Sequence, residues 1–322
     1  MRAWLPERHV SGPERASERD IDGLNRVFAE AFTDRYRRDG LVGVRVPYLN
    51  PQVWRYALLD AGDGAMVWRD DAGQIAAFNI AHRSGAEGWM GPLAVRPDQQ
   101  GVGIGKTIVR AAADWLMDQG VTTLGLETMP RTVENIGFYA RLGFTPGHLT
   151  LTMTQDLGMR GHAAPSLLSQ RLPAAREAAT ADASRLVAEL ARGPDFTREI
   201  MLTEQLGLGD TTLLDGPGGL DGLVVWHSAP LAEGRPKEEV RILKLAARDE
   251  RAFQSLITAT EAAAARAGIR RVAVRCETRH TAAFRRLVER GYRVRWTDLR
   301  MTYEGYPEPD LANGVLFSNW EI

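Results

Sequence analysis

Cysteine is almost absent from this sequence of 322 residues, which contains Cys276 alone. A single cysteine excludes an internal disulfide framework and a cluster of thiolate ligands, and we predict no metal site. It also fits a reducing compartment, so we expect a cytoplasmic protein. An excess of charge of one sign is lacking as well, since the formal net charge is −1. The composition therefore gives no reason to expect a nucleic-acid partner.

Long apolar runs are missing too. Residues 1–13 mix polar and apolar residues, include Pro6 and Pro13, and show no apolar core of a signal peptide. No later stretch approaches the ~20 apolar residues that a membrane span requires. We therefore expect no membrane partner.

The length and the order of the elements predict an α/β protein of two domains, because the chain is longer than one ordinary α/β domain needs. Apolar periodicity and turn residues predict the elements of the first half. They are a helix at 17–32, strands at 65–69, 75–82 and 89–95, a helix around 108–116, a strand at 121–127, a helix at 133–142 and a strand at 148–153.

The second half repeats this order and several of its signals. A helix is predicted at 180–191 and strands at 211–214, 220–226, 240–246 and 316–322. The pair Glu127-Thr128 with the later Gly143-Phe144 is echoed by Glu277-Thr278 with Gly291-Tyr292. Such self-similarity predicts a duplicated domain. We assign an N-terminal domain to 1–157, a linker to 158–173 and a C-terminal domain to 174–322.

A glycine-rich turn joins the strand that ends at Val95 to the following helix. Glycines allow a tight turn, and the free N–H groups at a helix start favour phosphate oxygens, so the turn predicts an anion site. A P-loop would need glycine at position 100, which is Gln100, and a dinucleotide fingerprint would need it at position 106, which is Lys106. Both motifs fail by one position.

The motif that fits is QxxGxG, from Gln100 to Gly105, and a second motif follows it from Glu134 to Phe144, with Asn135, Tyr139 and a terminal Gly-Phe. Together they resemble the GNAT superfamily of N-acetyltransferases over roughly residues 15–155. The resemblance implies two tandem domains, each a mixed, mostly antiparallel sheet flanked by helices. It also implies acetyl-CoA as cosubstrate and direct attack of an amine on the thioester.

The resemblance assigns roles to particular residues. The pyrophosphate is expected on the backbone of the turn, the pantetheine arm at Asn135, and the oxyanion at a strand N–H, for which Val95 is the candidate. Tyr139 is the candidate general acid that protonates the departing thiolate. The full set predicted to bind the cofactor is Leu93, Val95, Gln100, Gly101, Val102, Gly103, Gly105, Lys106, Thr107, Asn135 and Tyr139.

The general base is less clearly marked. Glu87 is the carboxylate nearest to the position where several family members place a base, a position that is Trp89 in this chain. Glu127 and His82 are alternatives, although the recurrence of Glu127 as Glu277 favours a structural role. A further hypothesis gives the role to the C-terminal carboxylate, at Glu321 or Ile322. The acceptor is expected near Asp34, Tyr36, Trp54 and Tyr56, with the neighbouring Arg35, Arg37 and Arg38 more typical of a solvated face.

The second copy lacks the parts that carry this chemistry. Its turn, residues 246–253, contains no glycine and presents Asp249 and Glu250. The position of Tyr139 becomes Leu287 and that of Asn135 becomes Ala283. We predict one active site, in a monomer or homodimer that acetylates a primary amine of a small molecule. A protein or peptide N-acetyltransferase and a non-catalytic acyl-CoA sensor remain alternatives.

Overall fold

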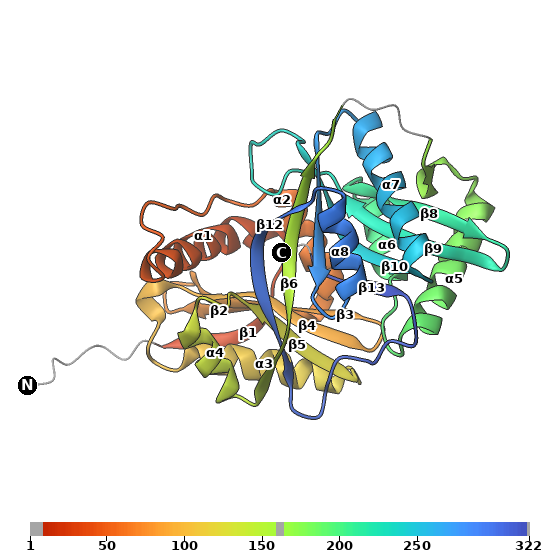
Figure 1. Cartoon of the computed structure of the whole chain (residues 1–322). Coiled ribbons are helices and arrows are strands. Elements are labelled where there is room, and N and C mark those ends of the chain that lie inside the picture. Colours follow the sequence, from red (N-terminus) through yellow and green to blue (C-terminus); the bar gives the residue numbers. More distant parts are fainter. Residues whose placement is uncertain (1–8, 159–163, 321–322) are drawn as a thin grey trace, which may run out of the picture.

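The computed structural model describes residues 9–158, here the first half, and 164–320, here the second half (Figure 1). The helices are α1 (Ile21–Arg38), α2 (Pro51–Ala61), α3 (Ile104–Asp118), α4 (Val133–Ala140), α5 (Pro173–Leu190), α6 (Thr197–Gln205), α7 (Glu250–Arg266) and α8 (Thr281–Glu289). The first-half strands are β1 (Val10–Arg15), β2 (Ala65–Asp70), β3 (Ile75–Ser84), β4 (Glu87–Val95), β5 (Thr123–Thr128) and β6 (Phe144–Asp156). The second-half strands are β7 (Ser166–Leu167), β8 (Gly209–Gly216), β9 (Gly219–His227), β10 (Glu239–Ala247), β11 (Arg271–Glu277), β12 (Arg293–Tyr303) and β13 (Val315–Ser318).

Local signals account for most of the first half. Ser17 and Asp20 form a capping box before α1, whose buried stripe includes Leu24 and Phe28. The strands predicted at 65–69 and 75–82 form the β2–β3 hairpin, and the carboxylate of Asp70 accepts hydrogen bonds from two backbone N–H groups of its turn. The sequence analysis missed β1, α2 and α6, and it gave no bounds for α7, β11, α8 and β12. For α2 a start signal was available, since Asn50 caps the helix and proline follows at its first position.

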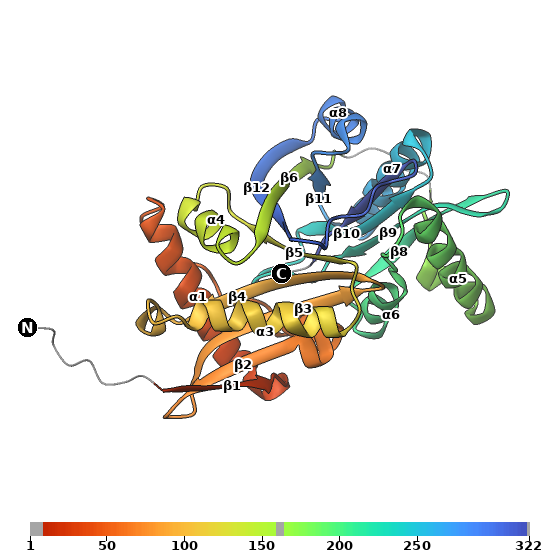
Figure 2. The same ribbon diagram turned by 90° about the horizontal axis from the view of Figure 1, so that it is seen from below.

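Alternate residues of the first-half strands face opposite layers of helices. Val67 of β2 belongs to a core that includes residues of α1 and α2, whereas its neighbours Met66 and Trp68 pack with α3 and α4. Figure 2 shows α3 lying along β3 and β4. The first-half sheet is thus covered on both faces, and the helices on both sides can contribute to a site at its edge.

The two halves share one sheet because their last long strands are exchanged. The order is β1-β2-β3-β4-β5-β12-β6-β11-β10-β9-β8-β7, with β13 paired to β10. Strand β12 of the second half pairs antiparallel with β5, with Met301 opposite Leu126, and β6 pairs with β11, with Leu151 opposite Cys276. Figure 1 shows β6 and β12 side by side at the centre of the molecule. The exchange brings residues of the second half next to β5.

The remaining predicted segments fall as follows. Part of the predicted linker, residues 159–163, lies outside the described residues, and Ser166–Leu167 within it form β7, which pairs with β8. The predicted C-terminal strand is present as Val315–Ser318. Among the described residues no helix is both long and apolar enough to cross a membrane.

Candidate active site

Strands β4 and β5 separate partway along their length. They pair in parallel from Glu87 opposite Thr123 to Met90 opposite Leu126. Beyond Met90, β4 continues to Val95 while pairing with β3 on its other side. The β4 edge from residue 91 to residue 95 therefore faces a gap in the sheet.

The backbone N–H of Val95 points into this gap. Arg96 donates its N–H to the carbonyl of Ala76, on the β3 side, at 2.8 Å. The carbonyl of Val95 instead accepts a hydrogen bond from Gln100 Nε2 at 2.9 Å. Because the N–H and C=O of one strand residue point to the same side and the direction alternates along the strand, Val95 and Leu93 present their N–H groups to the gap.

The glycine-rich turn leaves the start of α3 open. Gly101 and Gly103 have φ of 83° and 95°, a left-handed region that favours glycine, and Gly103 is the N-cap without any side-chain cap. The first N–H groups bonded within the helix are those of Lys106 and Thr107, which both reach the carbonyl of Gly103. The N–H groups before them are the unpaired donors of a helix start, which suits an anion.

The predicted cofactor residues come together at this turn. A cavity of about 200 Å³ is lined by six of them, Leu93, Val95, Gln100, Gly105, Asn135 and Tyr139. A Cβ at Gly105 would lie 3.5 Å from Phe138 of α4, so glycine here keeps α3 and α4 close. The other five, Gly101, Val102, Gly103, Lys106 and Thr107, lie on the exposed turn and first helical turn. Val102 is 59% exposed, so its side chain does not pack in the core.

A second cavity of about 360 Å³ meets the first. The two share Phe32, Leu93, Met129, Asn135 and Tyr139 as lining residues. Five residues of the second half also line the second cavity, Leu231, Arg275, Trp296, Asp298 and Trp320. The strand exchange thus places both halves around one chamber, and Tyr139 stands where the chamber joins the cofactor cavity.

Tyr139 is buried and its phenol keeps its proton. Its side chain packs against the rings of Phe138 and Phe144, with centroids at 5.1 and 6.1 Å. Burial raises the pKa of Tyr139 well above its ordinary value. The phenol therefore carries its proton at all ordinary pH values, which is the form that a general acid needs.

The structure does not bring Glu87 together with Tyr139. Its buried carboxylate accepts hydrogen bonds from Trp89 Nε1 at 2.8 Å and from Ser318 Oγ at 2.6 Å. Within the described part of the chain, neither of the two joined cavities includes it among its lining residues. The placement suits a group that fixes the Trp89 ring and the end of β13.

Glu127 lines the chamber and already accepts from three side chains. Its carboxylate binds Thr150 Oγ1 at 2.6 Å, Arg300 at 2.9 Å, and Arg275. Burial favours the neutral acid, yet Arg275 and Arg300 outweigh it and hold the pKa of Glu127 below its ordinary value. Arg300 is itself buried, and Glu277 lies 3.8 Å from it, so the two recurring glutamates of the repeat meet at one arginine.

Asp298 is the chamber carboxylate that the sequence analysis missed. It lies on β12, accepts a hydrogen bond from Trp296 Nε1 at 3.1 Å and faces Arg275 at 3.2 Å. Burial raises the pKa of Asp298 to about 6, and Glu127 adds to the rise while Arg275 opposes it. Polar alternation of Trp296, Asp298 and Arg300 along one strand was the signal that could have found it.

Two of the four predicted acceptor residues line the cavities and two do not. Tyr36 lines the chamber and Asp34 lines the cofactor cavity, where Arg37 and Arg38 pair with it. Trp54 and Tyr56 do not line the chamber: both are core residues, about 0% and 1% exposed. Their alternation with polar residues reflects the buried face of a helix that was not predicted.

His82 and the C-terminal carboxylate were the other base candidates. His82 is buried, hydrogen-bonded to Asp60 at 2.8 Å, and stacked on Trp320 with ring centroids 4.8 Å apart. Glu321 and Ile322 lie outside the described residues. The chain nevertheless reaches the chamber at Trp320.

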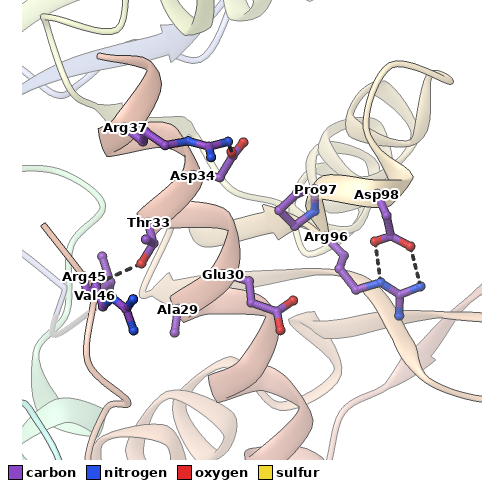
Figure 3. A pocket seen from close by; sticks show the side chains of 10 residues that line it. All are labelled: Ala29, Glu30, Thr33, Asp34, Arg37, Arg45, Val46, Arg96, Pro97 and Asp98. Atoms are coloured by element: carbon purple, nitrogen blue, oxygen red, sulfur yellow. Dashed lines mark hydrogen bonds and ion pairs between the residues drawn. The ribbon is translucent and has the colours of Figure 1, made fainter. Parts of the chain in front are cut away.

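A third and larger hollow, of about 750 Å³, lies between α1 and the turn after β4 (Figure 3). Its charged groups are largely paired: Arg96 with Asp98, and Arg37 with Asp34. Its lining includes none of the chamber carboxylates and not Tyr139. Size alone therefore does not make it the reaction site.

The second half has filled the place of its own cofactor gap. Strands β10 and β11 pair in parallel as far as Ile242 opposite Val274, as β4 and β5 do before they separate. From Lys244 to Ala247, however, β10 pairs antiparallel with β13. Asp249 caps α7 by accepting the N–H of Ala252 at 2.7 Å. The chain's own strand and carboxylate occupy the positions that stay open in the first half.

Comparison with known proteins agrees with this architecture. Residues 26–144 match the family described as the Acetyltransferase (GNAT) family. A GCN5-related N-acetyltransferase from Sphaerobacter thermophilus is 18% identical with a TM-score of 0.61, covering 96% of this chain and 99% of its own. A tandem GNAT protein from the clavulanic acid biosynthesis pathway is 14% identical with a TM-score of 0.59, covering 94% and 100%.

A more distant likeness extends to a longer enzyme. Saccharomyces cerevisiae N-myristoyltransferase, solved with bound myristoyl-CoA, is 10% identical with a TM-score of 0.62, covering 93% of this chain and 83% of its own. No curated protein matches the sequence. At these identities the solved structures show a shared fold, and the family match lies on the half that carries the open gap.

Proposed function

We propose that this tandem GNAT protein moves an acetyl group from acetyl-CoA to a primary amine of a small molecule. The match to the GNAT acetyltransferase family supports acyl transfer from an acyl-CoA donor. One observation carries the proposal. The cavity beside the glycine turn and the chamber shared by both halves join at Tyr139, with Asp298 on the chamber side. An acyl donor and an acceptor that enter separately can therefore meet there.

The residues of the first cavity fit the donor. The open N–H groups at the start of α3 suit a pyrophosphate, and Asn135 lies beside the β4 edge, where the pantetheine arm would run. The N–H of Val95 is a donor for the oxyanion that forms when the thioester carbon is attacked. The fit depends on backbone groups that the positive φ angles of Gly101 and Gly103 expose.

The proposed reaction requires one base and one acid. Asp298 accepts a proton from the ammonium of the acceptor, directly or through water, and the free amine attacks the thioester carbon. The new C–N bond forms, the C–S bond breaks, and Tyr139 gives its proton to the departing thiolate. The second nitrogen proton, lost as the amide forms, returns to the Tyr139 oxygen, and Asp298 releases its proton to solvent. An acid that stays neutral and a carboxylate with a pKa near 6 are the two forms needed at neutral pH.

A screen of acetyl-CoA turnover over amines, amino acids, polyamines, aminoglycosides and short peptides tests the proposal. Release of free CoA and a mass increase of one acetyl group on an amine are the expected results. Binding of acetyl-CoA without any turnover would favour a sensor, and transfer confined to peptides would favour a protein acetyltransferase. Either result would overturn the proposal.

We expect Gly103→Ala to weaken acetyl-CoA binding about tenfold. An L-residue at this left-handed position costs about 1–2 kcal/mol, which shifts the start of α3 and its N–H groups. Gly120→Ala is the matched control, since Gly120 also has a positive φ and open space around it but ends α3. Titration calorimetry with acetyl-CoA measures both. Equal affinities of the two variants would contradict the placement of the cofactor.

We expect one acetyl-CoA per chain, and the same stoichiometry in Asp249→Ala. Loss of this helix cap lowers the free energy of unfolding by about 1 kcal/mol. It does not open a second site, because β13 still pairs with β10. Calorimetric stoichiometry with thermal unfolding checks both statements. A second binding event in either protein would show that the second half retains a cofactor site.

A further inference from the structure

The chamber itself indicates which kind of amine enters it. Five aromatic residues line the chamber but not the cofactor cavity: Phe28, Tyr36, Trp89, Trp296 and Trp320. Tyr36 of α1 and Trp296 of β12 are in edge contact, with centroids 6.0 Å apart. Aromatic walls of this kind bind flat apolar groups and also attract a cation to the ring faces.

The two carboxylates of the chamber differ in how many donors they already accept from. Glu127 already accepts from Thr150, Arg275 and Arg300. Asp298 has two neighbouring donors, Trp296 Nε1 and Arg275, and an ionised carboxylate has about four acceptor positions. An incoming ammonium therefore finds spare acceptor capacity at Asp298.

The same groups offer little to an acidic or heavily hydroxylated acceptor. Arg275, a cation in the chamber lining, is engaged by Glu127 and Asp298. Arg275 Nε has no hydrogen-bond partner, but two carboxylates already offset the charge of this guanidinium, so an acceptor carboxylate would be repelled more than attracted. Sugar hydroxyls against ring faces would lose water without gaining partners, which is costly.

Resting on the function proposed above, we infer that the acceptor is a monoamine with an aromatic or similarly flat apolar body and no carboxylate. Its ammonium lies at Asp298 and its body lies against Tyr36 and Trp296. Trp320 completes the wall, with its ring already stacked on His82 and covered by Lys244 Nζ at 3.5 Å. The second half then acts as the acceptor-binding half: it supplies the carboxylate and two of the rings, whereas the first half holds the acyl donor.

Steady-state kinetics with matched amines test this inference. We expect kcat/KM for 2-phenylethylamine and tryptamine to exceed that for L-phenylalanine, glucosamine and spermidine by at least roughly tenfold, a factor equivalent to about 1.4 kcal/mol. L-Phenylalanine is the sharpest comparison because it differs from 2-phenylethylamine by its carboxylate alone. Faster turnover of the polar amines would overturn the inference and leave the proposed function standing. No turnover on any amine, with acetyl-CoA bound, would overturn both.

Two variants of Tyr36 separate ring contact from folding. Tyr36 is half-buried, so Tyr36→Ala should fold, and we expect it to raise KM for 2-phenylethylamine roughly tenfold, about 1.4 kcal/mol, with KM for acetyl-CoA unchanged. Tyr36→Phe keeps the ring and should restore most of the affinity. Quenching of tryptophan fluorescence by the amine gives a readout that does not need turnover. An unchanged KM in Tyr36→Ala, or equal losses in both variants, would contradict the inference.

Discussion

Asp298→Asn should lower kcat/KM for acetyl transfer by about 10²-fold or more, in the range measured for loss of a general base. The carboxylate stands in the chamber, and its replacement by an amide of the same shape removes the proton acceptor while keeping a carbonyl oxygen opposite Trp296 Nε1. The KM for acetyl-CoA should stay within a few-fold, because Asp298 does not line the cofactor cavity.

The pH profile makes this expectation specific. A base must be ionised to act, so kcat/KM of the unchanged protein should rise with pH through about 6 and level off above it. This acidic limb should disappear in Asp298→Asn. If the variant keeps both its rate and its acidic limb, the base is another group. Glu87→Gln is the matched variant, since it removes a buried carboxylate that lies outside the chamber lining.

The raised pKa of Asp298 also predicts how the stability of the protein changes with pH. An unfolded aspartate has a pKa near 3.9, and the folded value is raised to about 6, so the folded state binds the proton more tightly. Asp298 therefore disfavours folding above about pH 6, an effect that fades as the pH falls toward 4. Asp298→Asn should therefore not be less stable at pH 8 for want of this charge, so a loss of activity there reflects the lost base. Thermal unfolding of the variant checks this.

The sequence predicted the first-half elements well because their signals are local. The Asp70–Gly73 turn, the stripe of α1 and the open glycine turn all depend on residues close together in the chain. The acceptor side could not be found in that way. The exchange of β12 and β6 pairs residues far apart in the chain, such as Leu299 with Thr128, and it alone places Asp298 beside the first-half site.

The repeated glutamates, Glu127 and Glu277, also have a role that the sequence pattern alone could not predict. As a pattern it indicated duplication and favoured a structural role over a catalytic one. In space the two carboxylates converge on Arg300, whose guanidinium also lies 3.9 Å from the centre of the Trp89 ring. Removing Arg300 would take one buried counter-charge from both glutamates, each of which keeps one other arginine, Arg275 for Glu127 and Arg279 for Glu277. The repeat signal therefore marks the junction of the two halves.

Tyr139→Phe should lower kcat by about 10²-fold with little change in the KM for either substrate. The ring stays, so its contacts with Phe138 and Phe144 stay, and the variant should unfold at the same temperature. Only the hydroxyl is lost, and with it the proton for the departing thiolate.

The matched control is Tyr292→Phe in the second half. Tyr292 is also buried, its hydroxyl donates to Glu261 at 3.0 Å, and neither residue lines either of the two joined cavities. Its replacement should cost about 1 kcal/mol of stability and leave kcat unchanged. The two variants thus separate a phenol that stabilises from a phenol that reacts. If Tyr139→Phe turns over at the unchanged rate across the pH range, solvent rather than Tyr139 protonates the thiolate, and the junction of the two cavities serves only to bring the substrates together.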